Sequence, residues 1–164
     1  MAFSPTERKI KTIEELAAIA EKLRVEGKTI VQAHGVFDLV HPGHIHHFEE
    51  AKKLGDVLIA SLVEDRFVHK GPGRPFFGEA VRAAWLASLE VVDYVVFCGD
   101  IGPYEVIRKV RPTFYVKGED CKPLLIDPKS GISKDRDVCE SVGTEQRFLK
   151  EFPTPHSSEL FNKI

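Results

Sequence analysis

Hydrophobic residues follow two periodicities along the chain, one typical of helices and one of buried strands. Ile13, Leu16 and Leu23 mark one helical stripe that ends at Gly27, and Thr12 begins a stretch with the spacing of a capping box. This stripe predicts an opening helix. Runs such as IASLV at 59–63 lack polar alternation, which indicates strands buried on both faces of a sheet.

Predicted strands and helices alternate along the rest of the chain. The strands cover 29–33, 56–65, 93–98, 113–118 and 145–149. The helices cover 42–55, 78–89, 101–112 and 134–141, with a looser segment at 119–133 and a last helix from Ser157. The alternation predicts a doubly wound α/β fold: a five-stranded, Rossmann-like parallel sheet in the order 3-2-1-4-5, with helices on both faces.

Length and composition predict one domain over 1–164, in which a helix within 1–27 precedes a catalytic core at 28–164. Of the 164 residues, 43% are hydrophobic and 29% charged, which is typical of a chain that folds throughout. The net charge of −2 excludes a broad basic surface for nucleic acid. The three cysteines fit no disulfide framework, and no apolar run is long enough for a membrane span. We therefore expect a cytoplasmic protein that binds neither nucleic acid nor membrane.

Five of the seven histidines lie in the stretch AHGVFDLVHPGHIHHF at 33–48. His41 and His44 flank Pro42 and Gly43 at the start of a predicted helix, and Pro42 suits the first helical position. The N-terminus of a helix attracts anions, so two imidazoles there suit a phosphate group. The alternative is that both histidines are ordinary polar residues of a helix start.

A zinc site is a second alternative for the histidine stretch. His44 and His47 share a helix face, but His46 points elsewhere and no cysteine or carboxylate completes a tetrahedral set. His46 and His47 are most simply helix residues, with His47 a candidate for the rim of a substrate site. His34 and Gln32 lie beside the same loop and receive no assignment.

The motifs of the chain together resemble those of the nucleotidylyltransferase superfamily. The stretch at 33–44 fits the pattern G-x-F-D-x-x-H-x-G-H, and LGD, KGPGRP, VVDYVVF, RPTFYVKGED and SSELFNKI follow in the matching order. Within the superfamily the chain is most similar to the D-glycero-β-D-manno-heptose 1-phosphate adenylyltransferases. The resemblance implies transfer of AMP from ATP to a sugar 1-phosphate, with Mg²⁺ accompanying ATP and with the enzyme acting as a homodimer.

The resemblance also implies roles for individual residues. The implied catalytic residues are His41, His44 and Lys70. The implied nucleotide-binding residues are Gly35, Val36, Phe37, Gly43, His44, Lys117, Gly118, Asp120, Ser157 and Ser158. The implied acceptor-binding residues are Asp38, Arg74 and Arg82, and Asp38 is expected near the Mg²⁺ that ATP brings. The protein alone is expected to fix no metal.

Two other functions fit parts of the pattern. A cytidylyltransferase acting on a polyol or alcohol phosphate is disfavoured because Phe152 stands where such relatives carry an arginine. A nucleotide-binding module without catalysis would have lost the residues that meet the reacting phosphates, yet His41, His44 and Lys70 are all present. Release of pyrophosphate distinguishes a transferase from a nucleotide-binding module without catalysis.

Overall fold

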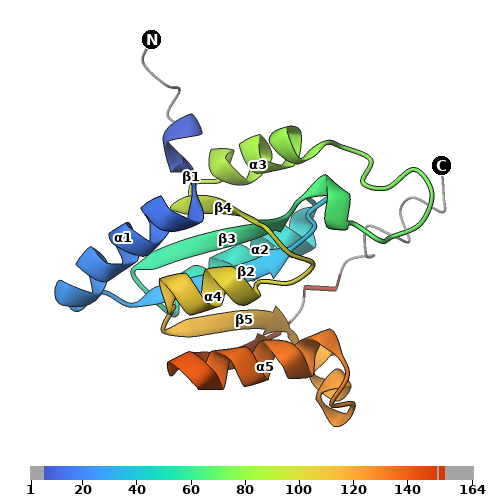
Figure 1. The fold of residues 1–164 in the computed structure, drawn as a ribbon. Coiled ribbons are helices and arrows are strands. Elements are labelled where there is room, and N and C mark those ends of the chain that lie inside the picture. The colour runs from blue at the N-terminus through green and yellow to red at the C-terminus, as the bar shows by residue number, and fades with distance from the viewer. Residues whose placement is uncertain (1–5, 151, 154–164) are drawn as a thin grey trace.

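The computed structural model describes residues 6–150 and 152–153. Its fold is built on a parallel sheet of six strands (Figure 1). Every strand pairs in parallel with its neighbours. The strands are β1 (Ile10–Lys11), β2 (Ile30–Gly35), β3 (Val57–Val63), β4 (Tyr94–Cys98), β5 (Phe114–Gly118) and β6 (Glu145–Leu149).

The strand order is β1-β4-β3-β2-β5-β6, so the predicted order of the five longer strands is confirmed. The sixth strand, β1, adds to the edge beside β4 and was not predicted, because two residues carry no hydrophobic period. Lys9 stabilises this edge: its Nζ donates to the carbonyl oxygens of Leu89 at 3.0 Å and Val92 at 2.7 Å.

Helices cover both faces of the sheet, as predicted. They are α1 (Ile13–Val25), α2 (Pro42–Lys52), α3 (Glu79–Ser88), α4 (Tyr104–Val110) and α5 (Gly131–Val142), with the short 3-10 helices η1 (Glu7–Lys9), η2 (Asp65–Phe67) and η3 (Glu119–Ile126). The helix predicted at 134–141 begins earlier, because the Ser130 side chain accepts a hydrogen bond from the Ser133 N–H and caps it. The helix predicted from Ser157 lies outside the described residues.

Two main hydrophobic clusters attach the helices to the sheet. Phe48 and Ala51 of α2 and Ala83 and Leu86 of α3 pack on one face. Leu16 and Ala20 of α1 and Val106 and Val110 of α4 pack on the other. In Figure 1, α1, α4 and α5 lie in front of the sheet and α2 lies behind it. Because the central strands are covered on both sides, their polar residues gather at the strand ends.

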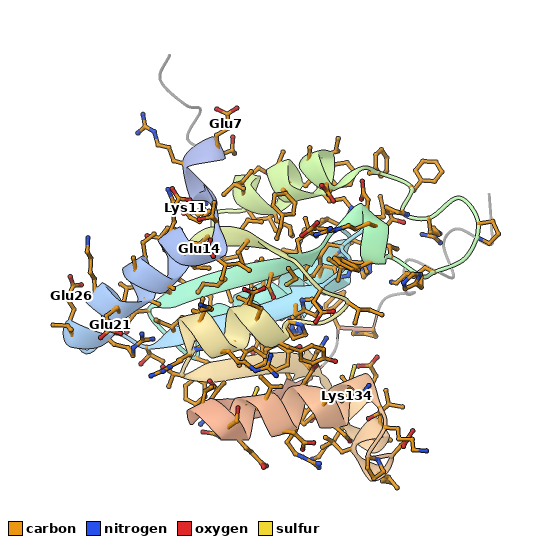
Figure 2. The ribbon with its side chains drawn as sticks, in the orientation of Figure 1. Glu7, Lys11, Glu14, Glu21, Glu26 and Lys134 are labelled. Carbon is orange, nitrogen blue, oxygen red and sulfur yellow. The ribbon has the colours of Figure 1, made fainter. Side chains whose placement is uncertain are left out.

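The outer faces of the helices carry charge. Glu14, Glu21 and Glu26 around α1 and Lys134 of α5 are exposed, and Figure 2 shows them at the periphery of the molecule. Among the described residues, no helix has the length and apolar character needed to cross a membrane.

The strand order has a switch point at β2, where the chain continues to β3 on one side and β5 lies on the other. His34 of β2 is in register with Ser61 of β3, and Ala33 is in register with Val116 of β5. In sheets of this kind ligands bind outside the carboxyl ends of the strands at the switch point. The loops after β2 and β5 therefore meet at one edge.

Candidate active site

The loop after β2 is held by an aromatic ring packed beneath it. Phe37 has a φ of 50°, an uncommon conformation for a bulky residue, and only 7% of its surface is exposed. Its ring lies 5.3 Å from the His44 ring and 5.2 Å from the Phe48 ring, between centroids. A Cβ added to Gly35 would lie 3.1 Å from the Phe37 ring, so the ring would have to shift by a few tenths of an ångström to admit it.

His41 and His44 lie against each other at the start of α2. Their ring centroids are 3.9 Å apart. His41 is the N-cap residue, and its Nδ1 accepts a hydrogen bond from the Gly43 N–H at 3.1 Å. Because Nδ1 is an acceptor, the ring proton of His41 resides on Nε2, which is left as a donor.

The first backbone N–H groups of α2 are already paired, which differs from the expected anion site at a helix N-terminus. Pro42 has no N–H, the Gly43 N–H donates to His41 Nδ1, and the His44 N–H donates to the His41 carbonyl oxygen at 2.9 Å. In this conformation a ligand at the start of α2 would therefore contact the histidine side chains and not the backbone N–H groups of the helix.

Burial and neighbouring titratable groups lower the pKa of the His44 ring. Its pKa is lowered to about 3, chiefly by burial, with smaller contributions from His41, His47 and Lys70, while a hydrogen bond to the Leu39 backbone opposes the shift. Burial also lowers the pKa of Lys70, with Arg74 and Lys117 adding to the effect. The loop after β3 thus brings Lys70 into the electrostatic field of the histidines and of Lys117. A site of this composition suits an anion.

His44 and His47 share one side of α2, called the histidine face below, and His47 is the member nearer to β5. The pKa of His47 is lowered to about 4, chiefly by burial and also by the charge of Lys117, while Asp120 opposes the shift. The Lys117 Nζ donates to the carbonyl oxygen of His34 at 3.3 Å, so it lies between β2 and β5. The structure thus brings His41, His44, Lys70, Lys117 and Asp120 to one edge of the sheet.

Asp38 accepts hydrogen bonds from the segment that leads into α3. Its Oδ1 accepts from the N–H groups of Phe76 at 2.7 Å and Phe77 at 3.1 Å, and Arg74 Nη1 donates to Oδ2 at 2.9 Å. Burial raises the pKa of Asp38, but these hydrogen bonds outweigh it and lower the pKa below its ordinary value. Asp38 is only 2% exposed, so it does not present the open carboxylate expected beside Mg²⁺.

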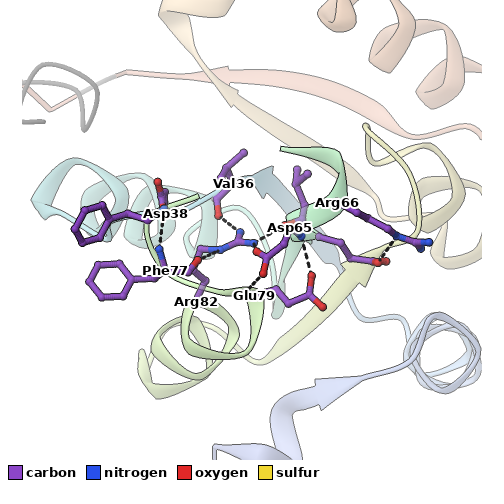
Figure 3. Close-up of polar contacts among 10 residues, drawn as sticks. Val36, Asp38, Asp65, Arg66, Phe77, Glu79 and Arg82 are labelled. Carbon is purple, nitrogen blue, oxygen red and sulfur yellow. Dashed lines mark hydrogen bonds and ion pairs between the residues drawn. The ribbon is translucent and has the colours of Figure 1, made fainter. Parts of the chain in front are cut away.

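Arg82 has a fully buried side chain, which corrects the expectation that it faces an acceptor. Figure 3 shows its guanidinium near Val36, Phe77 and Asp65. Nε donates to Phe77 O at 2.9 Å, Nη1 to Val36 O at 2.5 Å, and Nη2 to Val63 O at 3.0 Å and to Asp65 Oδ1 at 2.5 Å. Arg82 joins the loop after β2 to the loop after β3, where Lys70 lies.

Other residues of the sequence hypothesis fall in two groups. Val36 and Gly118 lie in or beside the loops just described. Ser157 and Ser158 lie outside the described residues. Sequence reasoning missed Asp65, which pairs with Arg82; the Asp65 N–H donates to Glu79 Oε2, and the Glu79 N–H donates to Asp65 Oδ2. No local motif signals Asp65, because its partners are distant in sequence.

Imidazoles and lysines lie together at the carboxyl ends of the parallel strands, beside the switch point of the sheet. This arrangement is typical of α/β proteins that bind nucleotides or phosphates. The model of the cytidylyltransferase-like family matches residues 32–158, and the chain belongs to this family. Its resemblance to the nucleotidylyltransferase superfamily is thereby confirmed.

Similar proteins include the bifunctional protein HldE of several bacteria. The protein of Geobacter metallireducens is 40% identical over 163 residues, covering 98% of this chain and 32% of that protein. The protein of Nitratiruptor is 46% identical over 121 residues, covering 73% of this chain and 26% of that protein. The chain therefore spans about a quarter to a third of the length of these relatives.

Two solved structures share the fold. A lipopolysaccharide core biosynthesis protein from Thermoplasma volcanium is 28% identical with a TM-score of 0.60, covering 79% of this chain and 100% of that one. A pantoate-beta-alanine ligase from Francisella tularensis, complexed with beta-gamma ATP and beta-alanine, has a TM-score of 0.65 at 17% identity, covering 93% of this chain and 72% of that one. The second likeness supports the fold alone.

The packing of Phe37 over Gly35 yields a first prediction. Gly35→Ala is expected to lower the free energy of unfolding by about 1–3 kcal/mol, because the new methyl group displaces the Phe37 ring. Gly131→Ala is the matched control: nothing lies within 4 Å of its added Cβ, and alanine favours the first turn of α5. Urea denaturation measures both. Equal effects at the two positions would contradict the packing.

The lowered pKa of His44 predicts how stability depends on pH. Between pH 6.5 and about 3 the unfolded chain binds a proton at His44 that the folded chain does not bind. The free energy of unfolding should therefore fall as pH falls, by up to about 1.4 kcal/mol per pH unit for this residue. His44→Gln should show a shallower loss between pH 6 and pH 4 in urea denaturation. An unchanged slope would contradict a neutral, buried His44.

Proposed function

We propose that this chain transfers AMP from ATP to a sugar 1-phosphate, giving an ADP-sugar and pyrophosphate. The observation that carries the proposal is the convergence of His41, His44, Lys70 and Lys117 at the carboxyl ends of β2, β3 and β5. Hydrogen-bond donors and cations at one switch point suit the charged oxygens of a nucleotidyl group in transfer.

The reaction is a direct displacement. A phosphate oxygen of the acceptor attacks the α-phosphorus of ATP, the bond from that phosphorus to the bridging oxygen breaks, and pyrophosphate leaves with the electron pair. The acceptor phosphate is already an anion, so no general base is needed. Ser61 is no candidate for a covalent nucleophile, because it is fully buried and donates its proton to Ala33 O.

The imidazoles and lysines supply electrostatic stabilisation. The His41 Nε2–H and the His44 ring donate to the non-bridging oxygens of the α-phosphate and to the departing pyrophosphate. Lys70 and Lys117 balance the charge of the triphosphate. Burial keeps the His44 ring neutral in the free protein, so one ring nitrogen carries a proton and the other is an acceptor.

The remaining residues position substrates and loops. The loop at 35–37 and Gly43 bound the triphosphate, Gly118 and Asp120 meet base and ribose, and Ser157 and Ser158 meet the outer phosphates, as the resemblance implies. Arg74 is 16% exposed and remains the candidate for the acceptor phosphate. Asp38 and Arg82 are positioning residues, because both are buried and hold the loops that carry the site.

The choice of ATP and of a heptose 1-phosphate rests on the sequence motifs. Phe152 stands where cytidylyltransferases of polyol phosphates carry an arginine, and its ring lies 5.3 Å from the His46 ring at the flank of α2. The motif order is most similar to that of heptose 1-phosphate adenylyltransferases, and the family model and the HldE relatives support nucleotidyl transfer on this scaffold.

Three further parts of the proposal concern metal, assembly and compartment. Among the described residues, no three carboxylate, histidine or cysteine side chains are grouped as a metal site, and Asp38 is buried. We assign Mg²⁺ to the nucleotide, whose phosphate oxygens are its ligands.

We also propose a homodimer in the cytoplasm, where Cys98, Cys121 and Cys139 stay reduced, as they are in the structure.

The direct experiment is a panel of nucleoside triphosphates mixed with phosphorylated acceptors and Mg²⁺. Pyrophosphate release should be greatest with ATP and a heptose 1-phosphate. Highest turnover with CTP and a polyol phosphate would replace the proposal with the cytidylyltransferase. Nucleotide binding without pyrophosphate from any acceptor would identify a binding module.

His44 is expected to act mainly in the transition state. His44→Ala should lower kcat about 10²–10³-fold, while nucleotide affinity falls far less. His46→Ala is the matched control, because His46 lies on the same helix and is not part of the histidine face. Steady-state kinetics and nucleotide titration give both quantities. Equal losses of kcat and affinity would reduce His44 to a binding residue.

Lys117 is expected to act in binding. Lys117→Ala should raise KM for ATP about tenfold or more, because it removes a cation held between β2 and β5. Lys122→Ala, at an exposed position of η3, serves as the control and should leave KM unchanged. A Lys117→Ala variant with the wild-type KM for ATP would refute this placement.

A further inference from the structure

A buried carboxylate lies between α5 and the sheet, beside an apolar cluster. Asp135 of α5 is only 4% exposed, and Tyr115 of β5 is fully buried. Tyr115 packs with Ile107 of α4 and Cys139 of α5, and Cys139 lies one helical turn after Asp135. The proposed reaction gives no role to Asp135 or to Tyr115.

The hydroxyl of Tyr115 donates a hydrogen bond to this carboxylate. The distance from Tyr115 Oη to Asp135 Oδ2 is 2.9 Å. Burial, and then the neighbouring charge of Asp135, raise the pKa of Tyr115 well above its ordinary value, so the phenol keeps its proton and is the donor. A buried carboxylate with a neutral donor is still costly, because its charge has lost the surrounding water. A compensating cation is therefore expected nearby.

Lys117 is a cation beside this pair. It lies two residues after Tyr115 in β5, so both side chains leave the same face of the sheet. Its Nζ lies over the Tyr115 ring, 5.8 Å from the ring centroid, within the range of a cation–π contact. Burial raises the pKa of Asp135, while the charge of Lys117 and the hydrogen bond from Tyr115 oppose this shift. Lys117 therefore attracts both the ring and the carboxylate.

Contacts on two sides restrict the ammonium group of Lys117. On the side of β2, Nζ donates to the carbonyl oxygen of His34 at 3.3 Å. On the side of β5, it lies over the Tyr115 ring, whose hydroxyl is bonded to Asp135. A phenol that donates to an anion is polarised, and its ring face then attracts a cation more strongly. Asp135 thus acts on Lys117 through space and through the ring.

We propose that Asp135 is a positioning residue of the nucleotide site, which together with Tyr115 holds the ammonium group of Lys117 between β2 and β5. The proposal rests on the proposed function for the role of Lys117 in binding ATP. A purely structural Asp135 would accept the hydrogen bond of Tyr115 and do nothing more. The two roles differ in one respect: a positioning residue affects ATP only while Lys117 is present.

The test is a double-mutant cycle between Asp135 and Lys117, with the affinity for ATP and Mg²⁺ measured by calorimetry without acceptor. Asp135→Asn removes the charge and keeps an oxygen that can accept from Tyr115. With Lys117 present, it should weaken ATP binding about three- to tenfold, the usual effect of one lost interaction. In the Lys117→Ala background it should leave the affinity unchanged or raise it, because the carboxylate then only repels phosphate. At saturating ATP, kcat should be unchanged in Asp135→Asn, so the loss appears in KM.

Two more variants keep the test decisive. Asp137→Asn is the matched control, the same substitution in the same helix at a side chain that is 63% exposed and pairs with Arg136. It should leave ATP affinity unchanged in both backgrounds. Tyr115→Phe keeps the ring and removes the donor to Asp135, so it should weaken ATP binding only while Lys117 is present. If Asp135→Asn does not fold, the cycle between Tyr115→Phe and Lys117→Ala decides by the same criterion.

The remaining outcomes also decide. Equal losses of ATP affinity in the two backgrounds would make Asp135 a structural residue and overturn the proposal. An Asp135→Asn variant with the wild-type affinity for ATP would overturn it as well. Failure of the proposed function is distinguishable, because affinity is measured without turnover. If no acceptor yields pyrophosphate but the effect of Asp135→Asn still depends on Lys117, Asp135 keeps its role and the transferase reaction falls.

Discussion

The buried guanidinium of Arg82 is the interaction on which the site depends. It bonds to the backbone carbonyls of Val36, Val63 and Phe77, which belong to three segments that are distant in sequence. Buried carbonyl oxygens without a partner are costly, so each segment is held where Arg82 can reach it. Asp38 adds further hydrogen bonds between the loop after β2 and the residues that lead into α3. The hydrogen bonds of Arg82 and Asp38 therefore set the distance between the histidines and the loop that carries Lys70.

The imidazoles on this frame differ because their surroundings differ. His41 accepts at Nδ1 from the Gly43 N–H and so carries its ring proton on Nε2. His44 is kept neutral chiefly by burial. The His34 ring lies instead beside the Ser61 hydroxyl and the Cys98 sulfur, at the end of β2. One residue type therefore occupies three different environments at this edge of the sheet.

The sequence predicts features that depend on local pattern and misses those that depend on distant partners. The order of the five longer strands followed from apolar runs that alternate with helical stripes, and the H-P-G-H motif located His41 and His44. The strand β1 and the early start of α5 were missed because two residues or one capping serine give little signal. The burial of Arg82 and the contact of the His34 ring with Ser61 depend on Val63, Asp65 and Ser61, which only the folded chain brings close.

The most direct test of this division among the imidazoles is long-range ¹H–¹⁵N correlation NMR of the labelled protein at pH 7, before and after addition of ATP and Mg²⁺. In the free protein the account predicts a bare Nδ1 in His41 and a neutral ring in His44. Addition of ATP should shift the ring signals of both residues. A charged imidazolium at His44, or the opposite tautomer at His41, would contradict it.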